Sequence, residues 1–285
     1  IAMRRYCSVL GLAARCTFWK VLAATLVSCG AEAALFLITL HGWPFVVYGP
    51  DQAWRADNPM GLEGLIAHSH IALCFGLGLA AVCGALALLG WEGSGCRTGY
   101  TLRRLRVGER ALSLLWGGYG TLCLLFYWAA HLGTVLALCA AAMPHLSERA
   151  ASPLALFLAC WRSPYLHALL PLEDVWLWGR NLLLCAALGL GTAAFSHERR
   201  HGHRAWGWIP LALGAALLFP LPMGAFPFQG LDPAFLPYLE TEVEVYTGSG
   251  SPVPGLMAFL LTGGSAAVLI NAALMICGRE PFYEN

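Results

Sequence analysis

The sequence predicts an all-α, polytopic membrane protein with six transmembrane helices. Its 285 residues are 58% hydrophobic and only 12% charged, whereas a soluble domain carries about 25% charged residues. Several apolar runs reach the roughly 20 residues that a helix needs to cross a bilayer. The connecting segments alternate between rich and poor in Lys and Arg, which is typical of multi-pass membrane proteins. The formal net charge of +1 also argues against a nucleic-acid partner.

The N-terminal region divides into a basic part and an apolar part. Residues 1–20 intersperse apolar side chains with four basic residues, a pattern that predicts an amphipathic helix lying in the membrane interface. Residues 21–40 are apolar and long enough for the first span. A signal peptide is the competing interpretation, because residues 26–29 loosely match a lipoprotein cleavage box. A signal peptide has an apolar region of only about 7–15 residues, and the run here is longer, so we expect an uncleaved span.

The whole chain, 1–285, is expected to form a single transmembrane domain. The apolar run within residues 144–174 is too short for a full span, and proline interrupts it. This region therefore predicts a helical hairpin, either re-entrant or extracellular. Residues 223–255 are rich in proline and contain no Lys or Arg, which indicates a second re-entrant or extracellular region. The five further spans are expected at about 65–91, 111–143, 175–195, 206–221 and 256–277.

The distribution of positive charge predicts the orientation. Six spans place both termini on one side, together with the basic segments 92–110 and 196–205. The positive-inside rule assigns that side to the cytoplasm of a cell (inner) membrane. The opposite side would hold only Arg55, Arg149, Arg162 and Arg180.

Residues 96–110 form a cytoplasmic segment with helical spacing. Leu102 and Leu105 could share one face, with arginines on the others. Such a helix could bury its leucines in a partner protein and pair its arginines with acidic side chains. A solvated loop held at the membrane by anionic lipid explains the same charge.

This segment, the basic N-terminal helix and the six spans together resemble the permease subunits of ABC-2-type ABC transporters. The resemblance implies that 96–110 is a coupling helix that docks on a cytoplasmic ATPase subunit, and that the chain works with a second permease protomer, identical or different. ATP and Mg²⁺ would bind the partner, because this chain has no G-x-x-x-x-G-K-[ST] motif; we therefore expect no enzyme activity, catalytic residue or cofactor here. The docking residues implied are Tyr100, Thr101, Leu102, Arg103, Arg104, Leu105, Arg106, Glu109 and Arg110.

Glu32 is the most unusual residue of the predicted spans. It falls near the middle of residues 21–40, where an ionised side chain costs about 2.5–3.5 kcal/mol on insertion scales. Such a residue generally faces a protein interior, a partner or a water path. A protonated carboxyl bonded to a neighbouring helix, with Asn271 as a candidate partner, is the simpler alternative.

His70 and His131 support a different class of function. Histidines on neighbouring membrane helices can ligate haem, so a haem-binding membrane anchor of a quinol-linked oxidoreductase is the alternative interpretation. Structural histidines that form hydrogen bonds at the membrane interface are the simpler explanation, and the one that we favour. The eleven cysteines predict packing residues and no metal site, because their spacing matches no zinc motif. The transported substrate is not predicted.

Overall fold

The computed structural model describes most of the chain, and every element within the described residues is helical. The description covers residues 2–42, 62–89, 108–146, 154–172, 175–200, 209–218 and 253–278. Its elements are α1 (Ala2–Leu40), α3 (Leu62–His68), α4 (Ile71–Ala87), α6 (Glu109–Ala142), the 3₁₀ turn η2 (Met143–His145), α7 (Ala155–Arg162), α8 (Pro164–Leu169), α9 (Val175–Arg200), α10 (Ile209–Leu218) and α12 (Val253–Gly278).

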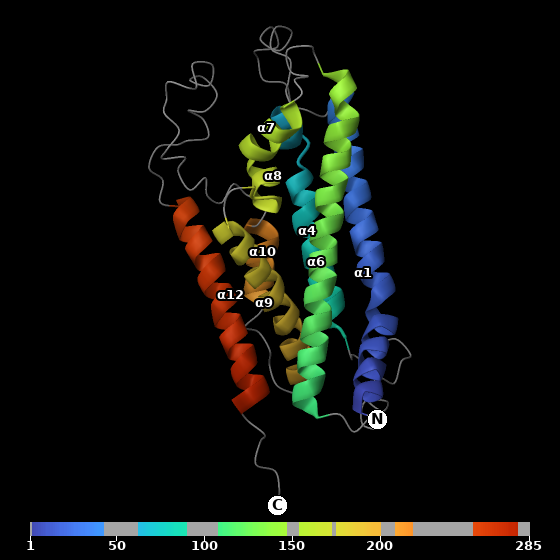
Figure 1. Ribbon diagram of the computed structural model, residues 1–285, viewed down its shortest axis with the longest axis vertical. Helices are drawn as coiled ribbons and strands as arrows, with labels where there is room; N and C mark the ends of the chain where they lie inside the picture. The colour runs from blue at the N-terminus through green and yellow to red at the C-terminus, as the bar shows by residue number, and fades with distance from the viewer. Residues whose placement is uncertain are drawn as a thin grey trace, which may run out of the picture.

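The long helices form an elongated bundle. The first residues of α1, the start of α6 and the C-terminal end of α12 lie at the same end of the bundle, and α7 and α8 lie toward the opposite end (Figure 1). We call the end of the bundle that holds the first residues of α1 the base of the bundle. Helix α6 packs most extensively against α9, and α1 packs against both α4 and α6.

Within the described residues, three helices are long and apolar enough to cross a membrane. They are Tyr6–Leu40, Glu109–His145 and Val175–Arg199, and the bent pair α3–α4 adds a fourth if it is one span. The all-helical fold is thus confirmed for the described residues, and its long apolar helices are compatible with a membrane protein. Helix α10 lies within the expected fifth span, and α12 covers the sixth with a shorter apolar stretch, Phe259–Leu274. The count of six spans stays a prediction.

Helix α1 differs from the expected division into an interfacial helix and a separate span. It runs without a break from Ala2 to Leu40, about 58 Å at 1.5 Å per residue. No proline interrupts this stretch. Val9 and Ala13, in its basic N-terminal part, are fully buried in a small core with Trp116 of α6. This packing inside the bundle holds the N-terminal part in line with the span.

The expected second span is bent near its beginning. Helices α3 and α4 meet at 52°, with Ser69 and His70 between them. His70 adopts the left-handed conformation, with φ of 52°, which a right-handed helix cannot contain. The apolar pattern of 65–91 gave no indication of this bend, because a side chain at an exposed bend leaves the pattern unchanged.

Glycines allow α6 and α9 to pack closely. A Cβ atom at Gly189 of α9 would lie 2.5 Å from the Thr121 backbone nitrogen and 2.9 Å from the Gly117 carbonyl oxygen, both on α6. A Cβ at Gly120 would lie 3.2 Å from the Gly189 Cα. Small residues at such crossings are the usual device for helix association in membranes.

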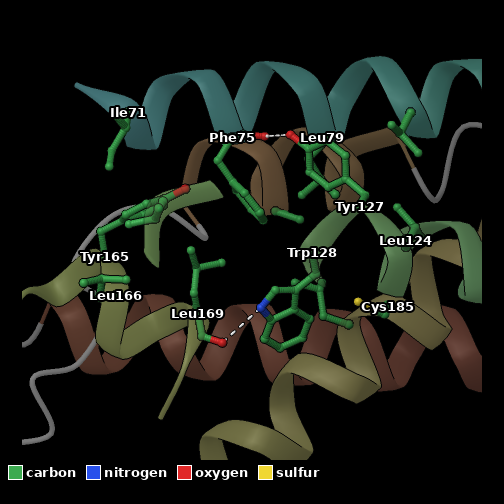
Figure 2. Close-up of a cluster of buried hydrophobic side chains, with 14 of the residues drawn as sticks. Ile71, Phe75, Leu79, Leu124, Tyr127, Trp128, Tyr165, Leu166, Leu169 and Cys185 are labelled. Atoms are coloured by element: carbon green, nitrogen blue, oxygen red, sulfur yellow. Dashed lines mark hydrogen bonds between the residues drawn. The ribbon is translucent and has the colours of Figure 1, made fainter. Parts of the chain in front are cut away.

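Two short helices, α7 and α8, lie within the expected hairpin region 144–174, and the hairpin itself stays a prediction. The Ser163 side chain accepts a hydrogen bond from the Leu166 backbone nitrogen, and Pro164 begins α8, which is the common start of a short helix. Leu166 and Leu169 are fully buried, and Trp128 of α6 donates its indole N–H to the Leu169 carbonyl oxygen at 3.0 Å (Figure 2). Helix α8 therefore belongs to the core of the bundle. Most of 223–255 lies outside the described residues.

Candidate functional site

The predicted docking segment falls almost entirely outside the described residues. Tyr100, Thr101, Leu102, Arg103, Arg104, Leu105 and Arg106 belong to that part of the chain. Only Glu109 and Arg110 are described, in the first turn of α6. The Glu109 carboxylate lies 3.8 Å from the His197 ring of α9, and both side chains are partly exposed. Docking on an ATPase therefore stays a prediction.

A buried polar cluster joins α1, α6 and α8. Glu32 of α1 and His131 of α6 are both 0% exposed, and the Glu32 Oε2 atom lies 2.7 Å from the His131 Nδ1 atom. The Ser28 hydroxyl lies 2.9 Å from the other ring nitrogen, Nε2. The Tyr165 hydroxyl donates a hydrogen bond of 3.2 Å to Glu32 Oε1. With Cys29, whose Sγ atom lies within 4.8 Å of ligand atoms of Glu32 and His131, these five residues form what we call the Glu32 cluster.

The local helix geometry explains why α1 supplies three members of this cluster. Ser28 and Glu32 are four residues apart, and Cys29 and Glu32 are three apart, so all three project toward one side of α1. His131 lies on the buried side of α6. Tyr165 follows Pro164 in the first turn of α8. Because α8 is buried in the bundle, the Tyr165 phenol reaches the Glu32 carboxylate.

The short contact between Glu32 and His131 requires a proton on one of the two side chains. A carboxylate oxygen and a deprotonated imidazole nitrogen are both acceptors and would repel each other at 2.7 Å. A proton carried by either side chain removes this repulsion. The contact is then an ion pair or a neutral polar contact, and Oε2 and Nδ1 are not aligned as a hydrogen bond. Tyr165 keeps its own proton, because burial and the adjacent Glu32 charge hold the pKa of the phenol well above its ordinary value.

Aromatic rings enclose the cluster on the side of α4. The centre of the Phe75 ring lies 5.2 Å from that of His131, edge to face, and the Tyr127 ring lies 4.5 Å from it. The Tyr127 hydroxyl donates to the Phe75 carbonyl oxygen at 2.7 Å, a bond that joins α6 to α4 (Figure 2). Gly78 permits this approach, since a Cβ there would lie 2.6 Å from the Ser28 Cβ and would collide with the Tyr127 hydroxyl. These apolar surroundings strengthen the electrostatic attraction within the cluster.

The structure brings together only part of what the sequence singled out. Glu32 meets His131, and not Asn271, which lies on an exposed face of α12. Ser28, Cys29 and Tyr165 were missed as partners. The three- and four-residue spacing around Glu32 could have indicated Ser28 and Cys29. Nothing in the sequence pointed to Tyr165, which is 133 residues away.

The two histidines of the haem interpretation lie in different surroundings. The His131 Nδ1 atom lies 2.7 Å from Glu32, and its Nε2 atom lies 2.9 Å from the Ser28 hydroxyl, so one of these neighbours would have to give way to iron. His70 is exposed at the bend between α3 and α4. The arrangement of the Glu32 cluster is suited to holding a proton or a cation between helices. No family model matches the chain, and searches of curated proteins and of solved structures found none that resembles it.

Proposed function

We propose that this chain is the membrane-spanning permease subunit of a transporter. The observation that carries the proposal is the fully buried Glu32–His131 pair between two helices long enough to cross a membrane. Ionisable residues inside membrane spans are costly, and they commonly mark a substrate or ion path. The Glu32 cluster is thus the part of the chain that we expect to contact, or to respond to, the transported species.

A purely structural role is a weaker explanation of the pair. Replacing a buried ion pair with apolar side chains of similar volume often leaves a protein as stable, or makes it more stable. Packing alone would therefore be served at least as well by leucine at both positions. The bend at His70 adds a second feature that a rigid anchor does not need, because it divides the α3–α4 pair into two arms.

We further propose that the energy comes from ATP, through docking of 96–110 on a partner ATPase. This segment leads directly into α6, and the first residues of α1 lie at the same end of the bundle (Figure 1). Force applied there acts on the two helices that carry Glu32 and His131. His131 lies 22 residues beyond Glu109, or about 33 Å along α6, so a rigid α6 would transmit a tilt to the cluster. A second permease protomer would complete the path.

Co-purification of ATPase activity tests this proposal. The full chain would be purified in mild detergent from its native membrane, and ATP hydrolysis in the eluate would be measured for the wild type and for Arg103→Ala/Arg104→Ala. The matched control is Arg199→Ala/Arg200→Ala, which removes the same charge from another basic segment. We expect activity with the wild type and the control and its loss with the Arg103/Arg104 variant. Absence of activity with the wild type, or equal activity in all three, would contradict ATP-driven transport.

The haem-anchor alternative has its own direct test. A visible absorption spectrum of the purified protein would show a Soret band if haem were bound. We expect none, because the two candidate ligands lie in different surroundings: His131 is fully buried, and His70 is exposed at the bend between α3 and α4. A band that disappears in His131→Gln would replace the transporter proposal with the haem anchor.

A further inference from the structure

We propose that Cys29, Glu32 and His131 bind a divalent transition metal ion of the zinc class. Each residue offers one ligand atom, and the three atoms lie within 4.8 Å of one another. Cys29 and Glu32 come from one turn of α1, and His131 comes from α6. The site is therefore held by two helices and does not depend on a loop.

The distances suit a tetrahedral ion after a small adjustment. Zinc binds sulfur at about 2.3 Å and nitrogen or oxygen at about 2.0–2.2 Å, so neighbouring ligand atoms on one ion lie about 3.4 Å apart. The Glu32 oxygen and the His131 nitrogen are 2.7 Å apart and would separate by about 0.7 Å. Rotation of the Glu32 side chain would supply this change, and the Cys29 sulfur, within 4.8 Å of the other two atoms, would move to a similar distance.

The charges of the three ligands also match a divalent cation. A thiolate and a carboxylate together carry two negative charges, and neutral imidazole adds none. The loaded site would then be electrically neutral, which is the favourable state inside a membrane. Starting from a neutral cluster, binding releases into water the thiol proton of Cys29 and the proton carried by Glu32 or His131.

Neighbouring residues orient the ligands as they do in established metal sites. The Ser28 hydroxyl holds the His131 Nε2 atom at 2.9 Å, which turns Nδ1 toward Glu32. The Tyr165 hydroxyl binds Oε1 of Glu32 and leaves Oε2 for the ion. Such outer partners fix the tautomer and position of metal ligands. A simple ion pair would need only Glu32 and His131, so Cys29 is the residue that separates the two interpretations.

This inference uses the same cluster as the proposed function but can fail independently. ATPase co-purification tests transport, whereas equilibrium titration with a metal ion tests binding. If no ATPase co-purifies, the metal site can still be shown by titration. If no metal binds, ATP-driven transport can still be shown by co-purification.

The experiment is a titration of the detergent-solubilised full chain with Co²⁺, followed by displacement with Zn²⁺. The protein would carry no polyhistidine tag. Co²⁺ gives visible bands that report coordination geometry and a near-ultraviolet charge-transfer band that reports a thiolate ligand. We expect one ion per chain with both signals, and displacement by Zn²⁺.

Variants identify the ligands. Cys29→Ser should lose the charge-transfer band, and Glu32→Gln and His131→Gln should lower the affinity at least as much as Ser28→Ala, for which we expect a decrease of about 10–100-fold. Cys16→Ser, a partly exposed cysteine on the same helix, is the matched control and should bind as the wild type does. A variant with alanine at His197, His201 and His203 controls for binding at the basic residues 196–205.

The outcomes are exclusive. Binding that is unchanged in Cys29→Ser, or that disappears only in the triple histidine variant, would overturn the proposal in favour of an adventitious site. No binding by a wild-type protein that melts cooperatively would also overturn it. Because Cys29→Ser replaces sulfur with oxygen at a partly exposed position, we expect it to fold.

Discussion

The energy of the Glu32–His131 pair can be measured with a double-mutant cycle. The perturbations are Glu32→Leu, His131→Leu and the two together. His131→Leu leaves a buried carboxylate with Tyr165 as its donor, and an uncompensated buried charge costs about 3–5 kcal/mol. Glu32→Leu leaves the His131 imidazole, which can become neutral. This variant therefore costs only about 1–3 kcal/mol, for the lost polar partner of the ring.

The double variant should be more stable than His131→Leu alone. With both charges gone, the Tyr165 hydroxyl loses its acceptor, at a cost of about 1–3 kcal/mol. The Ser28 bond to the ring is lost in His131→Leu as well, so it does not affect this comparison. The coupling energy should thus reach about 3 kcal/mol for a charged pair, whereas neutral hydrogen bonds between membrane helices average only about 0.6 kcal/mol. The two magnitudes are far enough apart to decide the state of the pair.

The assay is the free energy of unfolding from denaturant titration in mixed micelles, with a chelator present to exclude metal ions. Tyr165→Phe supplies an internal check. It should destabilise the wild type, where the phenol donates to a charged acceptor, and stabilise the Glu32→Leu/His131→Leu background, where it has lost that acceptor. Additive single effects, with a coupling no larger than that of a neutral hydrogen bond, would refute the reasoning.

Three further predictions follow from the packing. Gly189→Ala should destabilise the protein by about 1–3 kcal/mol in a thermal melt, because the new Cβ collides with the α6 backbone. The control is Gly118→Ala, whose Cβ meets no described atom within 4 Å. It should melt no lower than the wild type. His70→Gly should raise the melting temperature, because a left-handed backbone conformation costs a non-glycine residue about 1–2 kcal/mol and costs glycine little. The control His68→Gly, inside α3, should lower the melting temperature. The opposite order of the two melting temperatures would contradict the described bend. Trp128→Phe should cost about 1–3 kcal/mol in denaturant titration by leaving the Leu169 carbonyl oxygen without its indole donor, and a cost near zero would mean that α8 is not held there.

The membrane class and several helices followed from composition and apolar run length. The third and fourth expected spans match α6 and α9 in position, because a span must be long and apolar wherever it packs. The expected division of the N-terminal region between residues 20 and 21 was wrong, because α1 is continuous there. Basic residues there suggested an interfacial helix, but burial of Val9 and Ala13 against α6 and α9 depends on contacts far away in the chain.

The same limit applies to the candidate site. Glu32 stood out because a carboxyl within a span is expensive, and that reasoning needs only local sequence. Its partner did not stand out, since the pairing with His131 depends on which face of α6 meets α1. The expected Asn271 was chosen by polarity alone, and its helix α12 packs chiefly against α9.

The unbroken length of α1 couples the two ends of the bundle mechanically. Glu32 lies 23 residues beyond Val9, or about 35 Å along a stiff rod. A pivot of only about 5° at Val9 would sweep the carboxyl sideways by about 3 Å over that length. Hydrogen-bond distances span only about 0.5 Å, so a small rocking of α1 about its basic N-terminal part would be enough to separate Glu32 from His131.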